Sequence, residues 1–198
     1  MALLTLRRAW RLLAPAAVLA LLASLAPAGL RAEEAGTPVE YQVKAAFLFN
    51  FTKFVEWPDD VFQENGPLRL CILGADPFGG SLDGIVRGET VNGRPLAIER
   101  HRELADLSAC HLLFVSRSER ARLREIFEAV DGDSVLTVGD SPGFLAAGGM
   151  IELTLEGSKV RFAIDQAKAE RSRLKISSKL LRLAVDQRQD REDREDRR

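Results

Sequence analysis

The sequence predicts an α/β domain with a mostly parallel sheet covered by helices on both faces, followed by an antiparallel hairpin and a helical end. Three near-continuous apolar runs, residues 68–73, 109–116 and 134–138, alternate with helical segments. Such strands are typical of parallel sheets that are buried on both faces. Residues 150–156 and 159–164 instead alternate apolar and polar positions around Gly157 and Ser158, which predicts the hairpin.

The densest aromatic run, residues 41–58, predicts the first helix of the domain. Helical spacing separates a side facing the sheet from a side facing outward. The inward stripe that we expect consists of Val43, Phe47, Phe51, Phe54 and Val55, with Leu48 beside it, and the outward positions are Gln42, Thr52, Lys53 and Glu56. The helix ends before Pro58, because a residue that precedes proline is pushed out of the α region.

Phe49 lies outside the inward stripe, among the polar positions. Most aromatics of this helix are simplest to explain as core residues, whereas an aromatic side chain on the outward side favours contact with a partner. We therefore expect a partner-binding surface at Phe49 and at the end of the helix, Glu56, Trp57 and Pro58.

The remaining elements follow from shorter patterns. Ser118 begins an amphipathic segment with Ala121, Leu123, Ile126, Phe127 and Val130 on its inward side. The other predicted features are a helix over 78–86, a turn at Asn92-Gly93, a strand over 95–99, a strand-to-helix corner at Asp140-Ser141-Pro142, and helices over 166–174 and 177–185, the last capped by Ser177 or Ser178.

The first 32 residues have the order of a secretory signal. Arg7, Arg8 and Arg11 precede an Ala/Leu run, and small residues follow. Signal cleavage fits after Ala28 or after Ala32, and we favour Ala32. We expect an exported, periplasmic protein with a cleaved signal peptide (1–32), one domain (39–185) and a charged tail (186–198) that is either disordered or a frayed helix. An uncleaved membrane anchor is the alternative, but the apolar run falls short of the roughly 20 residues that span a bilayer.

The charge of the chain excludes an electrostatic nucleic-acid surface. The formal net charge is −1, and the four arginines of the signal segment leave about −5 on the remainder. We expect no binding to nucleic acid, and no membrane insertion once the signal is removed.

Export changes what the two cysteines indicate. Cys71 and Cys110 can form a disulfide in an oxidising compartment, closing a loop of about 40 residues worth roughly 4 kcal/mol. Two separate buried thiols on neighbouring strands are the alternative.

No catalytic, cofactor or metal site is predicted. The only histidines are His101 and His111, fewer than a zinc site would need at ligand spacing. Cys110 and His111 do not form a nucleophile–base pair, since adjacent strand residues point to opposite faces. A ligand cleft at the carboxyl ends of the strands, near Gly74-Ala75-Asp76, Ser116 and Gly139-Asp140, remains open, as in any such sheet.

Four motifs in this order resemble the YfiR-like family of exported bacterial proteins. They are KAAFLFNFTKFVEWP, LRLCILG, VLTVGDSPGFLAAGGMIELTLEGSKVRFAID and LKISSKLLRLA, and together they span about residues 39–185. One departure is Asp165-Gln166, where the family pattern has Asn followed by an apolar residue, which puts any role of that corner in doubt.

The resemblance implies a non-enzymatic periplasmic regulator. A family member of this kind represses a membrane-anchored diguanylate cyclase by binding its periplasmic sensor region, which lowers cyclic-di-GMP and biofilm formation. The family also implies a small α/β domain that can dimerise and can carry a disulfide, for which Cys71 and Cys110 stand at plausible positions. An alternative function also stays open: a periplasmic domain that senses a small molecule and relays the signal to a transporter or kinase.

Overall fold

The computed structural model describes residues 36–64 and 66–184. The predicted signal segment, the charged tail and Val185 lie outside these residues. The elements are α2 (Pro38–Phe54), β1 (Val55–Glu56), η1 (Asp59–Val61), β2 (Leu68–Leu73), α3 (Gly80–Val86), β3 (Thr90–Val91), β4 (Arg94–His101), η2 (Leu107–Ala109), β5 (Leu112–Val115), η3 (Arg117–Arg122), α4 (Leu123–Ala129), β6 (Leu136–Gly139), β7 (Ile151–Glu156), β8 (Lys159–Ile164), α5 (Gln166–Arg171), β9 (Lys175–Ile176) and α6 (Ser178–Leu183). In this part of the chain, no helix combines the length and apolar character needed to cross a membrane.

A seven-stranded sheet with the order β3-β4-β2-β5-β6-β7-β8 forms the centre of the domain. The strands from β4 to β7 run parallel to one another, whereas β3 and β8 pair antiparallel at the two ends. This confirms the predicted α/β class and the mostly parallel sheet. The predicted hairpin is formed by β7 and β8, with Ile151 opposite Ile164 and Glu156 opposite Lys159.

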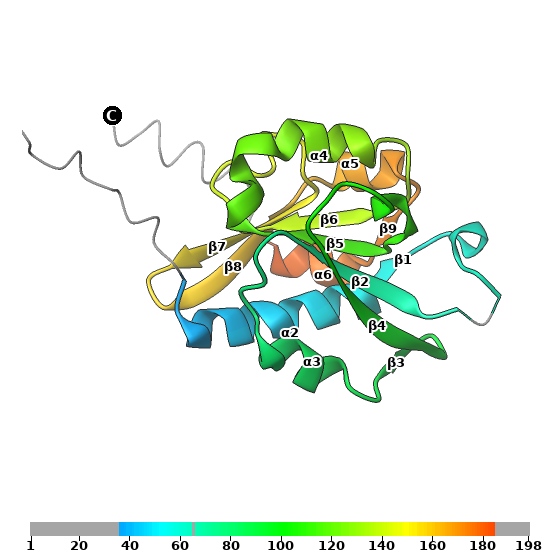
Figure 1. Cartoon of the computed structure of the whole chain (residues 1–198), viewed down its shortest axis with the longest axis horizontal. Helices are drawn as coiled ribbons and strands as arrows, with labels where there is room; N and C mark the ends of the chain where they lie inside the picture. Colours follow the sequence, from blue (N-terminus) through cyan, green and yellow to red (C-terminus); the bar gives the residue numbers. More distant parts are fainter. Residues whose placement is uncertain (1–35, 65, 185–198) are drawn as a thin grey trace, which may run out of the picture. The chain divides into compact units, whose positions relative to one another are not determined.

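The two faces of the sheet carry separate apolar clusters. Leu70 and Ile72 of β2 face a cluster that includes residues of α2, α3 and α6, and Cys71 and Leu73 face one that includes α4. This split follows from the alternation of side chains along a strand. Figure 1 shows α2 and α3 below the sheet and α4 above it.

The start of α2 is specified by its sequence. Thr37 accepts a hydrogen bond from the Glu40 backbone N–H at 3.2 Å, and the Glu40 side chain accepts one from the Thr37 N–H at 3.3 Å. This reciprocal capping box, together with Pro38 at the first helical position, fixes where the helix begins.

The face that α2 turns to the sheet differs from the predicted one. Val43 is 42% exposed, although the stripe places it inward, and Thr52 is fully buried, although the pattern places it outward. The observed buried positions are Glu40, Tyr41, Lys44, Ala45, Leu48, Phe51 and Thr52. Their spacing is helical, but three of them are charged or polar. The face that α2 turns to the sheet is therefore not its most apolar face. The Thr52 hydroxyl is satisfied inside the helix, since it donates to the Phe49 carbonyl at 2.6 Å.

Three other expectations are corrected. The segment after Ser118 begins as the 3-10 helix η3, and Ala121 is exposed. The first helix, predicted to continue up to Pro58, ends at Phe54, because Val55 and Glu56 form β1. This strand pairs antiparallel with β9 over two residues on each side, a pairing that no periodicity predicts. The predicted corner at Asp140-Ser141-Pro142 opens a series of turns instead of a helix.

The turns after Asp140 are held by a side chain of the neighbouring strand. The Glu152 carboxylate accepts hydrogen bonds from the backbone N–H groups of Gly143 at 3.1 Å and Leu145 at 3.0 Å. The ring of Phe144 lies so close to Gly139 and Gly149 that an added Cβ on either glycine would come within 2.3 Å of it. The segment is therefore shaped by Glu152 and by Phe144 packing, not by helix propensity.

The N-cap predicted for the last helix is confirmed, and the helix before it carries a second one. Ser177 caps α6 by accepting a hydrogen bond from the Leu180 N–H at 3.3 Å. Asp165 caps α5 in the same way, accepting from the Lys168 N–H at 2.9 Å. The departure from the family pattern at this corner therefore preserves a helix cap, which Asp and Asn supply equally well.

Candidate functional site

The predicted partner-binding residues lie at the C-terminal end of α2 and just beyond it, and they differ in exposure. Phe49 is half-buried, and the Lys53 ammonium lies 3.8 Å from its ring centroid. Glu56 is exposed on β1 opposite Lys175 of β9, and Pro58 is half-buried. Trp57, in contrast, belongs to the core and is only 9% exposed. The expectation that the Trp57 ring faces outward is wrong, and the binding role of the other three residues stays a prediction.

Trp57 anchors the end of α2 to the start of β5. Its indole N–H donates to the His111 carbonyl at 2.9 Å, and its ring meets the His111 ring edge to face. The His111 ring also stacks on the Phe62 ring, with the ring centroids 4.4 Å apart. His111 Nδ1 accepts a hydrogen bond from the Arg69 N–H at 3.1 Å, so the ring is bound as the neutral form.

Burial, reinforced by the nearby Arg69 and Arg94 guanidinium groups, lowers the pKa of His111 to about 4. The unfolded chain therefore binds a proton at this histidine between about pH 6.5 and pH 4, where the folded protein does not. His111 is thus a structural group whose neutral form the fold requires.

The N-terminal half of α2 carries a buried group of charges that sequence reasoning missed. Lys44 has no exposed surface, and its ammonium lies 2.5 Å from Asp140 Oδ2 and in contact with Glu40 Oε1. Asp140 follows β6 directly and is 3% exposed. The pair joins residues 96 positions apart in the sequence. The available signals were a lysine within an apolar helix and an aspartate after a buried strand, but neither indicates its partner.

Two further side chains complete this charged cluster of Glu40, Lys44 and Asp140. The Tyr41 hydroxyl donates to Asp140 Oδ2 at 2.9 Å, and burial together with the Asp140 carboxylate raises the pKa of Tyr41. Arg117, at the start of η3, lies 3.3 Å from Asp140 Oδ2 through Nε and also donates to the Asp140 carbonyl at 3.2 Å. The cluster connects α2 with the carboxyl ends of β5 and β6.

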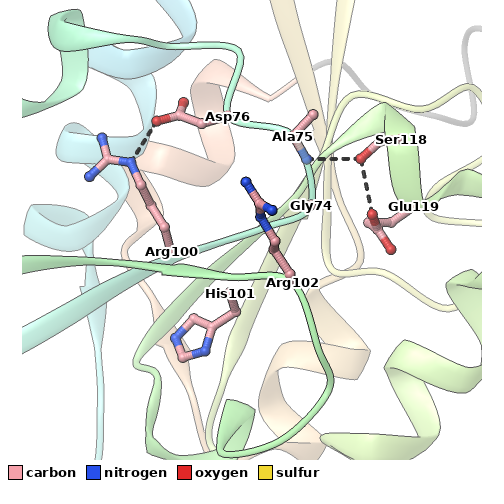
Figure 2. A pocket seen from close by; sticks show the side chains of 8 residues that line it. All are labelled: Gly74, Ala75, Asp76, Arg100, His101, Arg102, Ser118 and Glu119. Carbon is pink, nitrogen blue, oxygen red and sulfur yellow. Dashed lines mark hydrogen bonds and ion pairs between the residues drawn. The ribbon is translucent and has the colours of Figure 1, made fainter.

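A cavity of about 490 Å³ lies at the carboxyl ends of the neighbouring strands β2 and β4, shown in Figure 2. Gly74, Ala75 and Asp76 line it, as the strand-end cleft predicts. Ser116, Gly139 and Asp140 do not, because all three are buried elsewhere. The other lining residues are Arg100, His101, Arg102, Ser118 and Glu119.

Most polar groups of the cavity are already paired. Arg100 contacts Asp76 at 2.7 Å and Asp83 at 2.6 Å, and Glu119 contacts Arg122 at 2.7 Å. Figure 2 shows the Arg102 side chain directed toward Gly74 and Ala75, and among the described residues no ion-pair partner is found for it. The cavity therefore suits a small anionic or polar ligand better than it suits proton transfer.

Cys71 and Cys110 form a disulfide, with their Cα atoms 5.9 Å apart. Of the two interpretations that the sequence left open, the paired one is therefore present. His101, which lines the cavity, brings a ring nitrogen within 4.8 Å of both sulfur atoms. The three residues have no metal-ligand spacing along the chain, so only the fold brings them together.

Replacing Lys44 tests the charged cluster. Lys44→Met leaves Glu40 and Asp140 buried without the ammonium, which should lower the free energy of unfolding by about 3 kcal/mol. This cost is at the low end of the roughly 3–5 kcal/mol expected when one partner of a buried ion pair is removed. We expect the low end because Arg117 still contacts Asp140. Urea unfolding measures the change. Lys53→Met on the exposed side of the same helix is the matched control and should cost less than about 1 kcal/mol. Equal costs for the two variants would contradict the structural role of the cluster.

His111 predicts a pH dependence of stability. Since its folded pKa lies below its unfolded value, its contribution is complete above about pH 6.5 and is lost as the pH falls toward 4. The loss is at most about 3.5 kcal/mol, from roughly 1.4 kcal/mol per pKa unit over a fall from 6.5 to about 4. His111→Asn keeps a side-chain acceptor for the Arg69 N–H but does not titrate, so its unfolding free energy should fall less over this range. Parallel pH profiles for both proteins would show that His111 does not contribute.

One comparison with known proteins bears on this domain. A family model described as YfiR/HmsC-like matches residues 41–185. The match covers well over half of the chain and includes most of α2, the whole seven-stranded sheet, the disulfide, and Lys44 and Asp140 of the charged cluster, whereas Glu40 precedes it. It agrees with the four motifs that carry the resemblance in the sequence, and on this evidence the chain belongs to the YfiR/HmsC-like family.

Proposed function

We propose that the protein is a non-enzymatic periplasmic regulator that binds the periplasmic sensor region of an inner-membrane diguanylate cyclase and represses it. The observation that carries this proposal is membership of the YfiR/HmsC-like family, which suggests a periplasmic regulator of cyclic-di-GMP signalling. The identity of the cyclase as target, and export through a cleaved signal peptide, are parts of the proposal.

Repression by binding requires a difference in affinity between two states of the partner. A regulator that binds the inactive state more tightly shifts the population toward that state, by no more than its differential affinity. The domain is held by a disulfide and by two long-range contacts of the α2 region, Lys44 with Asp140 and Trp57 with His111. It is suited to this task because it presents one fixed surface.

The outward side of α2 is the surface that we propose for the partner. It is unusually apolar for an exposed face, since Val39 is 68% exposed and Val43 is 42% exposed. Helical spacing places both on the same side as Asn50, with Phe49 at the border. The half-buried Phe49 ring packs against the core cluster on one side and is covered by the Lys53 ammonium, a contact worth only about 0.5–1 kcal/mol that a partner can displace.

Glu56 and Pro58 extend this surface beyond the helix. Glu56 is exposed, and buried Trp57 beside it fixes the backbone of β1 through its bond to His111. We propose that Trp57 is a positioning residue, and that the contacts themselves are made by Phe49, Glu56 and Pro58.

The combined variant Phe49→Ala/Glu56→Arg tests this surface. It should release the partner and raise cyclic-di-GMP, measured in cells together with co-purification from detergent-solubilised membranes. The fold should survive, because truncating a half-buried aromatic costs less than the roughly 3–5 kcal/mol of a fully buried one.

Glu128→Arg is the matched control, since Glu128 is exposed on α4, over the opposite face of the sheet. It should leave cyclic-di-GMP and co-purification unchanged. If the combined variant is folded and exported yet still represses and co-purifies like the original protein, the partner surface lies elsewhere.

A small-molecule sensor is the second candidate function, and the cavity beside Arg102 favours it. Its volume of about 490 Å³ lies within the range of roughly 300–1,000 Å³ that is usual for ligand sites. A thermal-shift screen of small anionic metabolites should then find a ligand that stabilises the protein by about 2.7 kcal/mol at 100 times its Kd. Arg102→Ala should abolish the shift. A ligand that shifts both proteins equally would not be bound in this cavity, and a broad screen with no stabilising compound would count against a sensor role.

A further inference from the structure

The disulfide lies beside a histidine that the fold brings to it from another strand. Cys71 of β2 is opposite Glu99 of β4, and His101 follows two residues later, opposite Leu73. Residues paired in this register share a face of the sheet, so His101 lies on the same face as Cys71. Cys110 joins them from the segment just before β5. The two sulfur atoms and a His101 ring nitrogen all lie within 4.8 Å of one another.

We propose that the protein binds one zinc ion through Cys71, Cys110 and His101 whenever the two cysteines are in the dithiol form. Two thiolates and one imidazole are ligands that zinc accepts, at about 2.3 Å for sulfur and 2.0–2.1 Å for nitrogen. Ligand atoms around one tetrahedral zinc lie roughly 3–4 Å apart, as these bond lengths require. The observed spacing therefore needs only small side-chain movements once the sulfur–sulfur bond is opened.

Two other observations point to a ligand at this place. His101 Nε2 is buried, and no hydrogen-bond partner is found for it within the described residues. The Glu99 carboxylate lies 3.5 Å from it, and Arg69 contacts the same carboxylate at 3.2 Å. Because His101 also lines the cavity, a metal ion and a water molecule have a path from solvent to this place. The fourth ligand is then this water or the Glu99 carboxylate.

The disulfide and the metal exclude each other. A dithiol reductant delivers two electrons and two protons to the Cys71–Cys110 bond, giving two thiols, and is itself oxidised to a disulfide. Zinc then displaces both thiol protons, and its two positive charges balance the two buried thiolates. In the disulfide form each sulfur is bonded to the other, so no thiolate is available. This site does not depend on which partner the protein regulates.

The test is a cobalt titration, because Co²⁺ reports thiolate ligation through a near-ultraviolet charge-transfer band. The purified protein is reduced with a phosphine, kept free of oxygen and titrated with Co²⁺ and then Zn²⁺. We expect the band to saturate at one Co²⁺ per chain, to vanish when Zn²⁺ is added, and to be absent from the oxidised protein. His101→Ala should weaken Co²⁺ binding at least tenfold. Replacing a residue that only orients a metal ligand already costs roughly 10–100-fold in affinity, and losing the ligand itself should cost no less.

His111→Asn is the matched control, since it changes the only other histidine, and it should bind Co²⁺ like the original protein. Circular dichroism follows the fold in each sample. If the reduced metal-free protein loses its native spectrum, zinc should restore that spectrum in the original protein and not in His101→Ala. The proposal is overturned by a reduced protein that shows no band, by equal affinity in His101→Ala, by equal binding to the oxidised protein, or by a lost fold that zinc does not restore.

Discussion

The contact between buried Lys44 and Asp140 is the constraint on which the arrangement of α2 depends. Removing an ammonium and a carboxylate from water costs several kcal/mol for each ion, so such a pair persists only with close geometry and added hydrogen bonds. Here Glu40, Tyr41 and Arg117 supply them. Any rotation of the helix would leave these charges buried without their partners. The charged cluster thus selects one orientation of α2 more strictly than apolar contacts would, since those tolerate repacking.

The two ends of α2 are held at opposite ends of the central strands. Asp140 follows the carboxyl end of β6, whereas the His111 carbonyl that Trp57 binds precedes the amino end of β5. The helix therefore spans the length of these central strands, from the carboxyl end of β6 to the amino end of β5. Both anchors are polar contacts inside an apolar cluster. With its orientation fixed in this way, the helix exposes Val39 and Val43 and brings Phe49 to the border of the exposed side. The surface proposed for the partner is in this sense a consequence of the buried charges.

The sequence predicted what depends on local pattern. The apolar run at 68–73 is β2 with unchanged bounds, the alternating segments form the β7–β8 hairpin, and Ser177 caps α6. It failed where a residue's environment is set by a distant partner. Lys44 and Thr52 face inward because Asp140 and the helix backbone satisfy them, and Trp57 is buried because His111 offers a carbonyl. The same reason hid the grouping of His101 with the cysteines, which depends on the register of β2 against β4.

Thiol labelling measures the orientation of α2 directly, because the native cysteines are joined and do not react. Single substitutions Val43→Cys and Thr52→Cys place one thiol on each side of the helix with little change in volume. If the Lys44–Asp140 contact sets the orientation, Val43→Cys should be labelled much faster than Thr52→Cys, which should be strongly protected. Adding Lys44→Met should raise the labelling rate at Thr52→Cys. The reverse order, with Val43→Cys protected and Thr52→Cys reactive, would mean that the apolar stripe orients the helix and would contradict the account.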